Sequence, residues 1–467
     1  MASELGTASH PLRVAIVGSG PAGFYVAEHL LKQTDVEVRI DMFDRLPTPF
    51  GLVRFGVAPD HPKIKSVTRV FDKIGRNAAF GFYGNVEIGK DITLAELRDH
   101  YHQICFATGA QTDRQMGIPG EDLPRSHAAT EFVAWYNGHP DYRDYEFDLS
   151  VERVAVVGVG NVAVDVARIL SKAPDELAKT DIAGHALEAL RESKIREVYM
   201  LGRRGPAQAA FTNVEARELG ELDGADIRVV PEEVRLDPVS QAELDASDDD
   251  TLKKKVAIVH EFLEKPRSGK PRLLTLRFLV SPVELMAGPD GGVRAARLAK
   301  NEIYAEGGKL QSRATGEIEE LPVDLVFRSV GYRGVPIAGV PFNERSGVIP
   351  NELGRVIDPA TTRPLAGTYV SGWIKRGPSG VIGTNKKDGT ETATAMLEDA
   401  AASATLKPTK PDSSAIEALV RVRQPDLVTF EDWIRLDAVE VARGEREGRP
   451  RHKLTSRAEV KEALAGG

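Results

Sequence analysis

The chain has 467 residues, enough for two or three domains with substantial cores. Its hydrophobic content of 42% and charged content of 28% are those of a globular protein, and a net charge of -8 argues against general nucleic-acid binding. No apolar run approaches the ~18 residues of a membrane span, and the first ten residues resemble neither a signal nor a transit peptide, so we expect a cytoplasmic protein without a membrane partner.

The first predicted unit is a strand that begins at residue 12, a glycine-rich turn and a helix over residues 24–33. Gly18, Gly20 and Gly23 have the spacing of the dinucleotide fingerprint. Gly18 permits the turn, Gly20 lets a pyrophosphate approach the backbone, and Gly23 lets the helix pack close to the strand. A second strand, 36–43, ends at Asp44, where a carboxylate should meet an adenosine ribose hydroxyl. The alternative is a glycine-rich turn without a ligand.

The segment 46–62 is rich in proline and glycine, which excludes a continuous helix or a central strand. His61 within it is either a structural histidine or part of a site. Ser66 is expected to cap a helix that ends near residue 75. A strand at 82–88, a helix opened by the capping box Thr93–Glu96, and a strand at 104–107 should complete this unit.

Cys105 is the only cysteine, and its apolar strand predicts that it is buried. The chain therefore has no intrachain disulfide, no Cys-x-x-Cys redox pair and no four-cysteine set for an iron–sulfur cluster. No metal site is predicted. A disulfide reductase, which shares a two-nucleotide architecture, is excluded.

The fingerprint recurs after a polar stretch, 119–145, which is expected to connect two domains. A strand at 153–157 leads into a second glycine turn, 158–163, and a helix to about residue 171. The next strand, 195–201, ends in Arg203 and Arg204 instead of an acid. Guanidinium groups at this place bind a 2′-phosphate, so the second nucleotide should be NADP and not NAD. The alternative is a solvated basic turn.

The second half of the chain is expected to contain mostly strands and then helices. An acidic stretch at 245–250 precedes Lys253, Lys254 and Lys255, which are either a solvated face or a docking patch. A hairpin or meander of 274–286 with 293–304 and strands at 323–330 and 368–373 should follow. A glycine-rich turn, 374–385, leads into a helix over 389–402, and the helical tail with Trp433 should pack on the first domain.

Six stretches of the chain resemble the adrenodoxin reductase family of ferredoxin–NADP reductases, and the resemblance covers residues 12–399. They are Pro49-Phe-Gly-Leu-Val-Arg54, Gly56-Val-Ala-Pro-Asp-His-Pro62, Gly160-Asn-Val-Ala163, Gly202-Arg-Arg204, and Gly372-Trp-Ile-Lys-Arg-Gly-Pro-Ser-Gly-Val-Ile-Gly383, together with the first fingerprint. The chain departs from the family at Asp44, where glutamate is common.

The resemblance implies an α/β fold with two Rossmann-like dinucleotide-binding domains, the NADP domain being inserted into a discontinuous FAD domain. The implied divisions are 1–110 and 332–467 for FAD and 111–331 for NADP. The FAD contacts expected from the fingerprint and the resemblance are Gly18, Gly20, Pro21, Ala22, Gly23, Asp44, Leu52, Ile88, Trp373, Gly380, Val381 and Ile382. The expected NADP contacts are Val159, Gly160, Asn161, Val162, Arg203, Arg204, Glu215 and Gly380. His61 and Glu215 match the catalytic residues near the nicotinamide.

The implied activity is that of a ferredoxin–NADP⁺ reductase, in which NADPH passes hydride to FAD and single electrons then go to a ferredoxin-type iron–sulfur protein. Such ferredoxins tend to be acidic, so Lys253 to Lys255 are the candidate docking residues. We expect a monomer or weak homo-oligomer and no nucleic-acid partner. A flavin monooxygenase would couple NADPH oxidation to oxygenation of a small substrate, and a non-catalytic NADP sensor would lack FAD.

Overall fold

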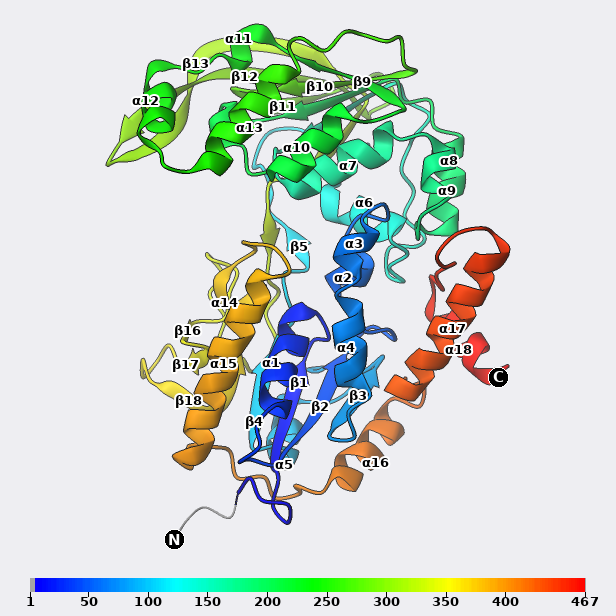
Figure 1. Ribbon diagram of the computed structural model, residues 1–467, viewed down its shortest axis with the longest axis vertical. Helices are drawn as coiled ribbons and strands as arrows, with labels where there is room; N and C mark the ends of the chain where they lie inside the picture. Colours follow the sequence, from blue (N-terminus) through cyan, green and yellow to red (C-terminus); the bar gives the residue numbers. More distant parts are fainter. Residues whose placement is uncertain (1–4, 467) are drawn as a thin grey trace.

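The computed structural model describes residues 5–466 and divides them into two lobes, each built on its own sheet (Figure 1). The lower lobe in that view has a seven-stranded sheet in the order β16-β17-β18-β4-β1-β2-β3. Its strands are β1 (Leu12–Val17), β2 (Val38–Asp44), β3 (Phe80–Gly84), β4 (Gln103–Phe106), β16 (Asn351–Glu352), β17 (Arg355–Ile357) and β18 (Pro364–Val370). All pairs except those of β16 and β17 are parallel. The lower sheet is thus assembled from both ends of the chain.

The upper lobe has a six-stranded parallel sheet in the order β6-β14-β7-β8-β10-β9. Its strands are β6 (Ser126–Ala128), β7 (Arg153–Val157), β8 (Glu197–Leu201), β9 (Ala225–Val229), β10 (Arg272–Arg277) and β14 (Leu325–Arg328). A separate antiparallel sheet follows, made of β11 (Val280–Ala287), β12 (Val293–Glu306) and β13 (Lys309–Pro322). Because β7 and β8 carry the second glycine turn and the arginine pair, this lobe holds the second fingerprint.

The chain crosses between the lobes twice, and the two crossings lie side by side. β5 (Thr112–Asp113) pairs antiparallel with β15 (Tyr332–Arg333) in a two-stranded ribbon. Figure 1 shows β5 between the two lobes. The upper lobe is therefore an insertion into the lower one.

Helices cover both sheets (Figure 1). Those of the lower lobe are α1 (Pro21–Leu31), α2 (Leu52–Phe55), α3 (Pro62–Lys65), α4 (Thr68–Gly75), α5 (Leu94–His100), α14 (Trp373–Arg376), α15 (Thr384–Ala401), α16 (Ser413–Arg423), α17 (Phe430–Arg446) and α18 (Arg457–Ala465). Those of the upper lobe are α6 (Ala129–Tyr136), α7 (Asn161–Ser171), α8 (Pro174–Leu177), α9 (Gly184–Arg191), the 3₁₀ turn η1 (Pro206–Gln208), α10 (Asn213–Gly220), α11 (Pro231–Val234), α12 (Pro238–Ala246) and α13 (Asp250–Glu261). Within residues 5–466, none of these helices is long and apolar enough to cross a bilayer.

Several predicted elements are confirmed. β7 has the predicted bounds, α7 ends at Ser171, and Thr93 and Glu96 form a complete capping box at α5. Cys105 is fully buried, as expected of a core residue. Trp433 lies in the lower core and its ring meets Phe50 edge-on, at 5.5 Å between centroids, so the tail packs on the lower lobe.

Other predictions are wrong at their boundaries. α1 begins at Pro21, before the expected start at 24, because a proline is tolerated in the first helical turn. α15 begins at Thr384 and not at 389. Ser66 does not open the helix that ends at Gly75, because α4 begins at Thr68 with Val67 as its N-cap. Ser66 is instead the C-cap of α3, and its hydroxyl donates to the carbonyl of Lys63 at 2.6 Å.

Two larger segments also differ from the prediction. The stretch 119–145 is not a polar connector, because α6 within it buries its aromatic face in the upper core. The predicted hairpin or meander of 274–286 with 293–304 is partly confirmed, because β11, β12 and β13 form an antiparallel meander. The first residues of the predicted segment belong to β10, which lies in the parallel sheet.

Candidate active-site cleft

A cleft of about 1610 Å³ runs between the lobes, and both glycine turns open into it. It is lined by nearly all the residues that the sequence predicts for cofactor binding and catalysis. These are Gly18, Gly20, Pro21, Ala22, Asp44, Leu52, His61, Ile88, Val159, Gly160, Asn161, Val162, Arg203, Arg204, Glu215, Trp373, Gly380, Val381 and Ile382. Gly23 is the exception among them, because it faces the strand beneath the helix.

The first glycine turn has the geometry expected of a pyrophosphate site. Gly18 has φ +108°, and a Cβ there would lie 2.5 Å from the carbonyl oxygen of Ala107. A Cβ on Gly23 would lie 2.3 Å from the carbonyl oxygen of Gly18, so this glycine lets helix and strand pack closely. A Cβ on Gly20 would meet no described atom within 4 Å. The space beside Gly20, at the N-terminus of α1, therefore fits an anionic group.

The second turn repeats this arrangement in the upper lobe. Gly158 has φ +137°, and a Cβ there would lie 2.3 Å from the carbonyl oxygen of Ser329. A Cβ on Gly160 would again meet nothing within 4 Å among the described atoms. Gly160 is also the N-cap of α7, whose free backbone N–H groups favour negative charge. Two equivalent phosphate cradles thus face one cleft.

Asp44 is held in place at the end of β2. Its Oδ2 accepts hydrogen bonds from the backbone N–H of Ser19 at 2.8 Å and from the Ser19 hydroxyl at 2.5 Å. Its Oδ1 accepts from the backbone N–H of Leu46 at 2.9 Å. The carboxylate is therefore preorganised at the rim of the first turn, where a ribose hydroxyl is expected.

Arg203 and Arg204 are exposed at the end of β8 and carry no ion pair within the described part of the chain. Their backbone is fixed although their side chains are free. The carbonyl of Arg203 accepts from the Asn301 amide at 3.0 Å, and that of Arg204 accepts from the backbone N–H of Leu279 at 3.2 Å. Two unpaired guanidinium groups on a braced loop fit a phosphate.

His61 lies at the meeting point of the two lobes, in a cluster of charged side chains. Its Nε2 is 2.5 Å from Nη1 of Arg168 and 3.0 Å from Oε2 of Glu218. A guanidinium can only donate and a carboxylate can only accept, so Arg168 and Glu218 favour opposite roles for Nε2. Nδ1 is 3.9 Å from a carboxylate oxygen of Asp165. The ring is therefore oriented from three sides.

Two carboxyl groups near His61, those of Asp165 and Glu215, have raised pKa values, which favour their neutral forms. Burial raises the pKa of Asp165 well above its usual range, and repulsion from Glu215 adds to this effect. Burial also raises the pKa of Glu215, against the attraction of His61. Ligand atoms of His61, Glu215 and Glu218 lie within 4.8 Å of one another, as in a metal site. Arg168 contacts all three, however, and supplies the positive charge that a metal ion would bring.

The glycine turn after β18 closes the cleft on the lower side. Trp373 begins α14, and its Nε1 donates to the carbonyl of Ser379 at 3.2 Å. Gly380 has φ +81°, which an L-residue rarely adopts. The ring of Trp373 lies 5.4 Å from that of Tyr332, in the crossing strand β15. Trp373 thus brings this part of the cleft into contact with the connection between the lobes.

Sequence reasoning missed Arg168, Glu218 and Asp165 of the cluster around His61, and it missed Tyr332 beside Trp373. Arg168 follows the second fingerprint on α7, but nothing local shows that it faces a loop of the other lobe. Among the three lysines predicted as docking residues, Lys255 is half-buried, and its Nζ donates to the carbonyl of Ala209 at 2.6 Å. Lys253 and Lys254 are exposed on α13.

Known proteins resemble this chain over almost its full length. A family model described as pyridine nucleotide-disulphide oxidoreductase matches residues 12–205. The NADPH-ferredoxin reductase FprA of Mycobacterium tuberculosis is 47% identical over 460 residues, which cover 96% of this chain and 98% of that protein. The mitochondrial NADPH:adrenodoxin oxidoreductase of Bos taurus is 42% identical over 455 residues, or 95% and 90% of the two chains. A solved structure of M. tuberculosis FprA in complex with NADPH matches with a TM-score of 0.90 and 45% identity, over 98% of this chain and 100% of that one.

Proposed function

The chain belongs to the adrenodoxin reductase family of ferredoxin–NADP reductases, and from this premise we propose which residues of its cleft bind each cofactor and which take part in the reaction. It is an FAD-dependent oxidoreductase that takes electrons from NADPH and delivers them to a ferredoxin-type protein. When bound, FAD and NADPH supply the hydride and single-electron chemistry, and the protein supplies binding, orientation and electrostatics. The observation that carries this function is the single cleft into which both phosphate cradles open.

The lower cradle is the proposed FAD site, and the upper cradle with the arginine pair is the proposed NADP site. Asp44 would bind the ribose of the flavin nucleotide, and Arg203 with Arg204 would bind the 2′-phosphate of NADPH. We propose domain boundaries at residues 110 and 331, and the pairing of β5 with β15 beside both positions supports them. FAD would thus be held by residues from both ends of the chain.

The chain has a single cysteine, so it lacks the redox-active cysteine pair of the disulfide reductases that its family description also covers. Cys105 is fully buried, and burial raises the pKa of its thiol to about 12. A thiol in this state is a poor nucleophile, and it has no cysteine partner in the chain. Electrons therefore leave through an external partner. The cytoplasmic location, the absence of nucleic-acid binding and the weak or absent self-association stay predictions.

His61 and Glu215 are the proposed catalytic pair, which would orient the nicotinamide or move a proton beside it. Replacing His61 by alanine should slow flavin bleaching at saturating NADPH on the order of tenfold or more, because the ring is fixed in the cleft between the lobes. Flavin content should not change, since His61 is not among the residues proposed to hold FAD. Anaerobic stopped-flow absorbance measures this rate, with His10→Ala, an exposed histidine, as control. An unchanged rate in His61→Ala would remove the residue from the mechanism.

Lys253 and Lys254 on α13 are the proposed docking residues for an acidic ferredoxin. Reversing both charges should raise the apparent KM for ferredoxin several-fold at low salt, because exposed charge pairs contribute roughly 0.2–1 kcal/mol each. NADPH oxidation by ferricyanide should be unaffected. The matched control reverses Lys407 and Lys410, which are exposed on the lower lobe. Equal ferredoxin kinetics in the two double variants would place the docking surface elsewhere.

A further inference from the structure

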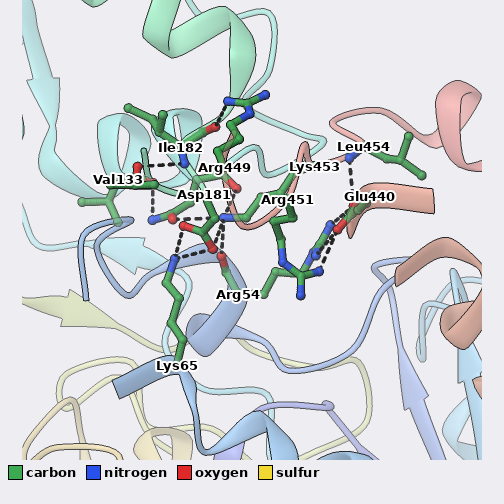
Figure 2. A network of polar contacts seen from close by, with 12 residues as sticks. Arg54, Lys65, Val133, Asp181, Ile182, Glu440, Arg449, Arg451, Lys453 and Leu454 are labelled. Atoms are coloured by element: carbon green, nitrogen blue, oxygen red, sulfur yellow. Dashed lines mark hydrogen bonds and ion pairs between the residues drawn. The ribbon is translucent and has the colours of Figure 1, made fainter. Parts of the chain in front are cut away.

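The C-terminal segment 449–455 passes between the two lobes and places a lysine in their contact (Figure 2). The side chain of Lys453 is only 1% exposed. Its Nζ donates to the carbonyl of Arg54 at 3.2 Å and to the carbonyl of Asn137 at 3.1 Å. Arg54 belongs to α2 of the lower lobe, and Asn137 is the C-cap of α6 in the upper lobe. One ammonium group therefore joins both lobes to the tail.

Asp181 of the upper lobe is the shared anion of this network. Its Oδ2 lies 3.3 Å from Nζ of Lys453, and its two oxygens accept from Nζ of Lys65 at 2.6 and 2.8 Å. Burial alone would raise the pKa of Asp181, but Lys453 and Lys65 outweigh it and hold it at about 2. A charged aspartate thus stands between two buried lysines, one from the tail and one from α3, and burial lowers the pKa of both lysines while Asp181 raises it.

The tail is itself anchored to the lower lobe through a second buried ion pair. The guanidinium of Arg54 donates to both oxygens of Glu440 on α17, at 2.9 and 2.5 Å. The backbone N–H of Leu454 donates to the same carboxylate at 2.8 Å. Because Leu454 follows Lys453 directly, this pair fixes where the ammonium lies.

The elements held by this network also line the active-site cleft. α2 carries Leu52, and His61 is the N-cap of α3, one turn before Lys65. A change in the angle between the lobes at Asp181 would therefore move His61 relative to the upper lobe. Within the charged cluster, His61 meets the upper lobe only through side chains.

We propose that Lys453 is a positioning residue for electron transfer: it sets the angle between the lobes, and thereby the approach of the nicotinamide to the flavin. This inference rests on the proposed function, because it assigns one nucleotide to each lobe. The network would act through the orientation of α2, α3 and His61, without touching either nucleotide.

The variant Lys453→Met separates this role from general stability. It leaves Asp181 paired with Lys65, so no buried charge is unpaired, and the chain should fold. At saturating NADPH the rate of flavin bleaching should fall on the order of tenfold, since small misplacements of reacting groups are costly. Flavin content should stay normal. The matched control is Arg451→Met, because among the described residues Arg451 hydrogen-bonds only to Asp437 and Glu440 of α17. Without Arg451, Glu440 keeps its bonds from Arg54 and from the backbone of Leu454, so the link of Lys453 to both lobes stays in place.

A distance measurement gives a readout that is independent of activity. The buried thiol of Cys105 should resist labelling, so cysteines introduced at exposed Thr34 and Glu192 can carry spin labels selectively. The distance distribution between the lobes should broaden in Lys453→Met and stay as in wild type in Arg451→Met. If Lys453→Met does not fold, Lys65→Met tests the same link with Asp181 still neutralised by Lys453, and the same broadening is expected.

Two outcomes would overturn the proposal. One is an unchanged distance distribution in Lys453→Met or in its substitute Lys65→Met. The other is a bleaching rate that falls equally in Lys453→Met and Arg451→Met. Failure of the proposed function would look different, because NADPH would then fail to bleach the flavin of the wild-type protein.

Discussion

Replacing Gly20 by valine is expected to abolish FAD binding and leave the chain folded. The backbone of Gly20 is extended, with φ -77° and ψ 179°, so an L-residue fits there without strain. A Cβ there would meet no described atom within 4 Å, so the side chain would extend into the proposed pyrophosphate space. Overpacking of this kind costs about 3 kcal/mol, which corresponds to a loss of affinity of more than a hundredfold. Flavin absorbance relative to protein, with thermal unfolding of the same sample, measures both effects.

The equivalent change in the other lobe is the matched control. Gly160 also has an extended backbone and open space where a Cβ would stand. Gly160→Val should keep its flavin and lose NADPH binding. If Gly20→Val keeps a full complement of flavin, the lower cradle does not hold the pyrophosphate of FAD.

Removing both arginines of the upper cradle should produce the second large effect. Hydrogen bonds to charged groups contribute about 1.5–3 kcal/mol each, so Arg203→Ala combined with Arg204→Ala should lower kcat/KM for NADPH by roughly two orders of magnitude or more. The value for NADH should change little, because NADH has no 2′-phosphate. The ratio of the two kcat/KM values is the decisive quantity. A parallel fall with both nucleotides would show that the arginines support the fold of the loop instead of recognising the phosphate.

Much of the secondary structure and both glycine turns could be predicted, because they depend on residues that are close in the sequence. The strand β7 and the capping box at Thr93 follow from patterns within ten residues of sequence. The two phosphate cradles could be predicted from the glycine spacing, since each glycine meets a steric requirement within a single turn. The placement of Asp44 and of the arginine pair follows from the same unit, because both stand at the end of the strand after the turn.

The rest depends on contacts between segments far apart in the chain. Arg168 is a polar residue on an ordinary helix until His61 and Glu218 are brought to it from other elements. Lys453 looks like a charged residue of a polar tail, and charge usually predicts exposure. Its burial is possible only because Asp181 and two carbonyl groups meet it from both lobes. No local sequence pattern predicts that these groups come together around Lys453.

The most direct test of the central claim is an anaerobic visible-absorption titration of the purified protein, with NADPH and NADH in parallel. A flavin spectrum that NADPH bleaches readily and NADH bleaches poorly is the expected result. It would support FAD binding, reduction by NADPH and recognition of the 2′-phosphate in one experiment. Folded protein that shows no flavin bands even after addition of FAD would contradict the assignment of this chain as an FAD-dependent reductase.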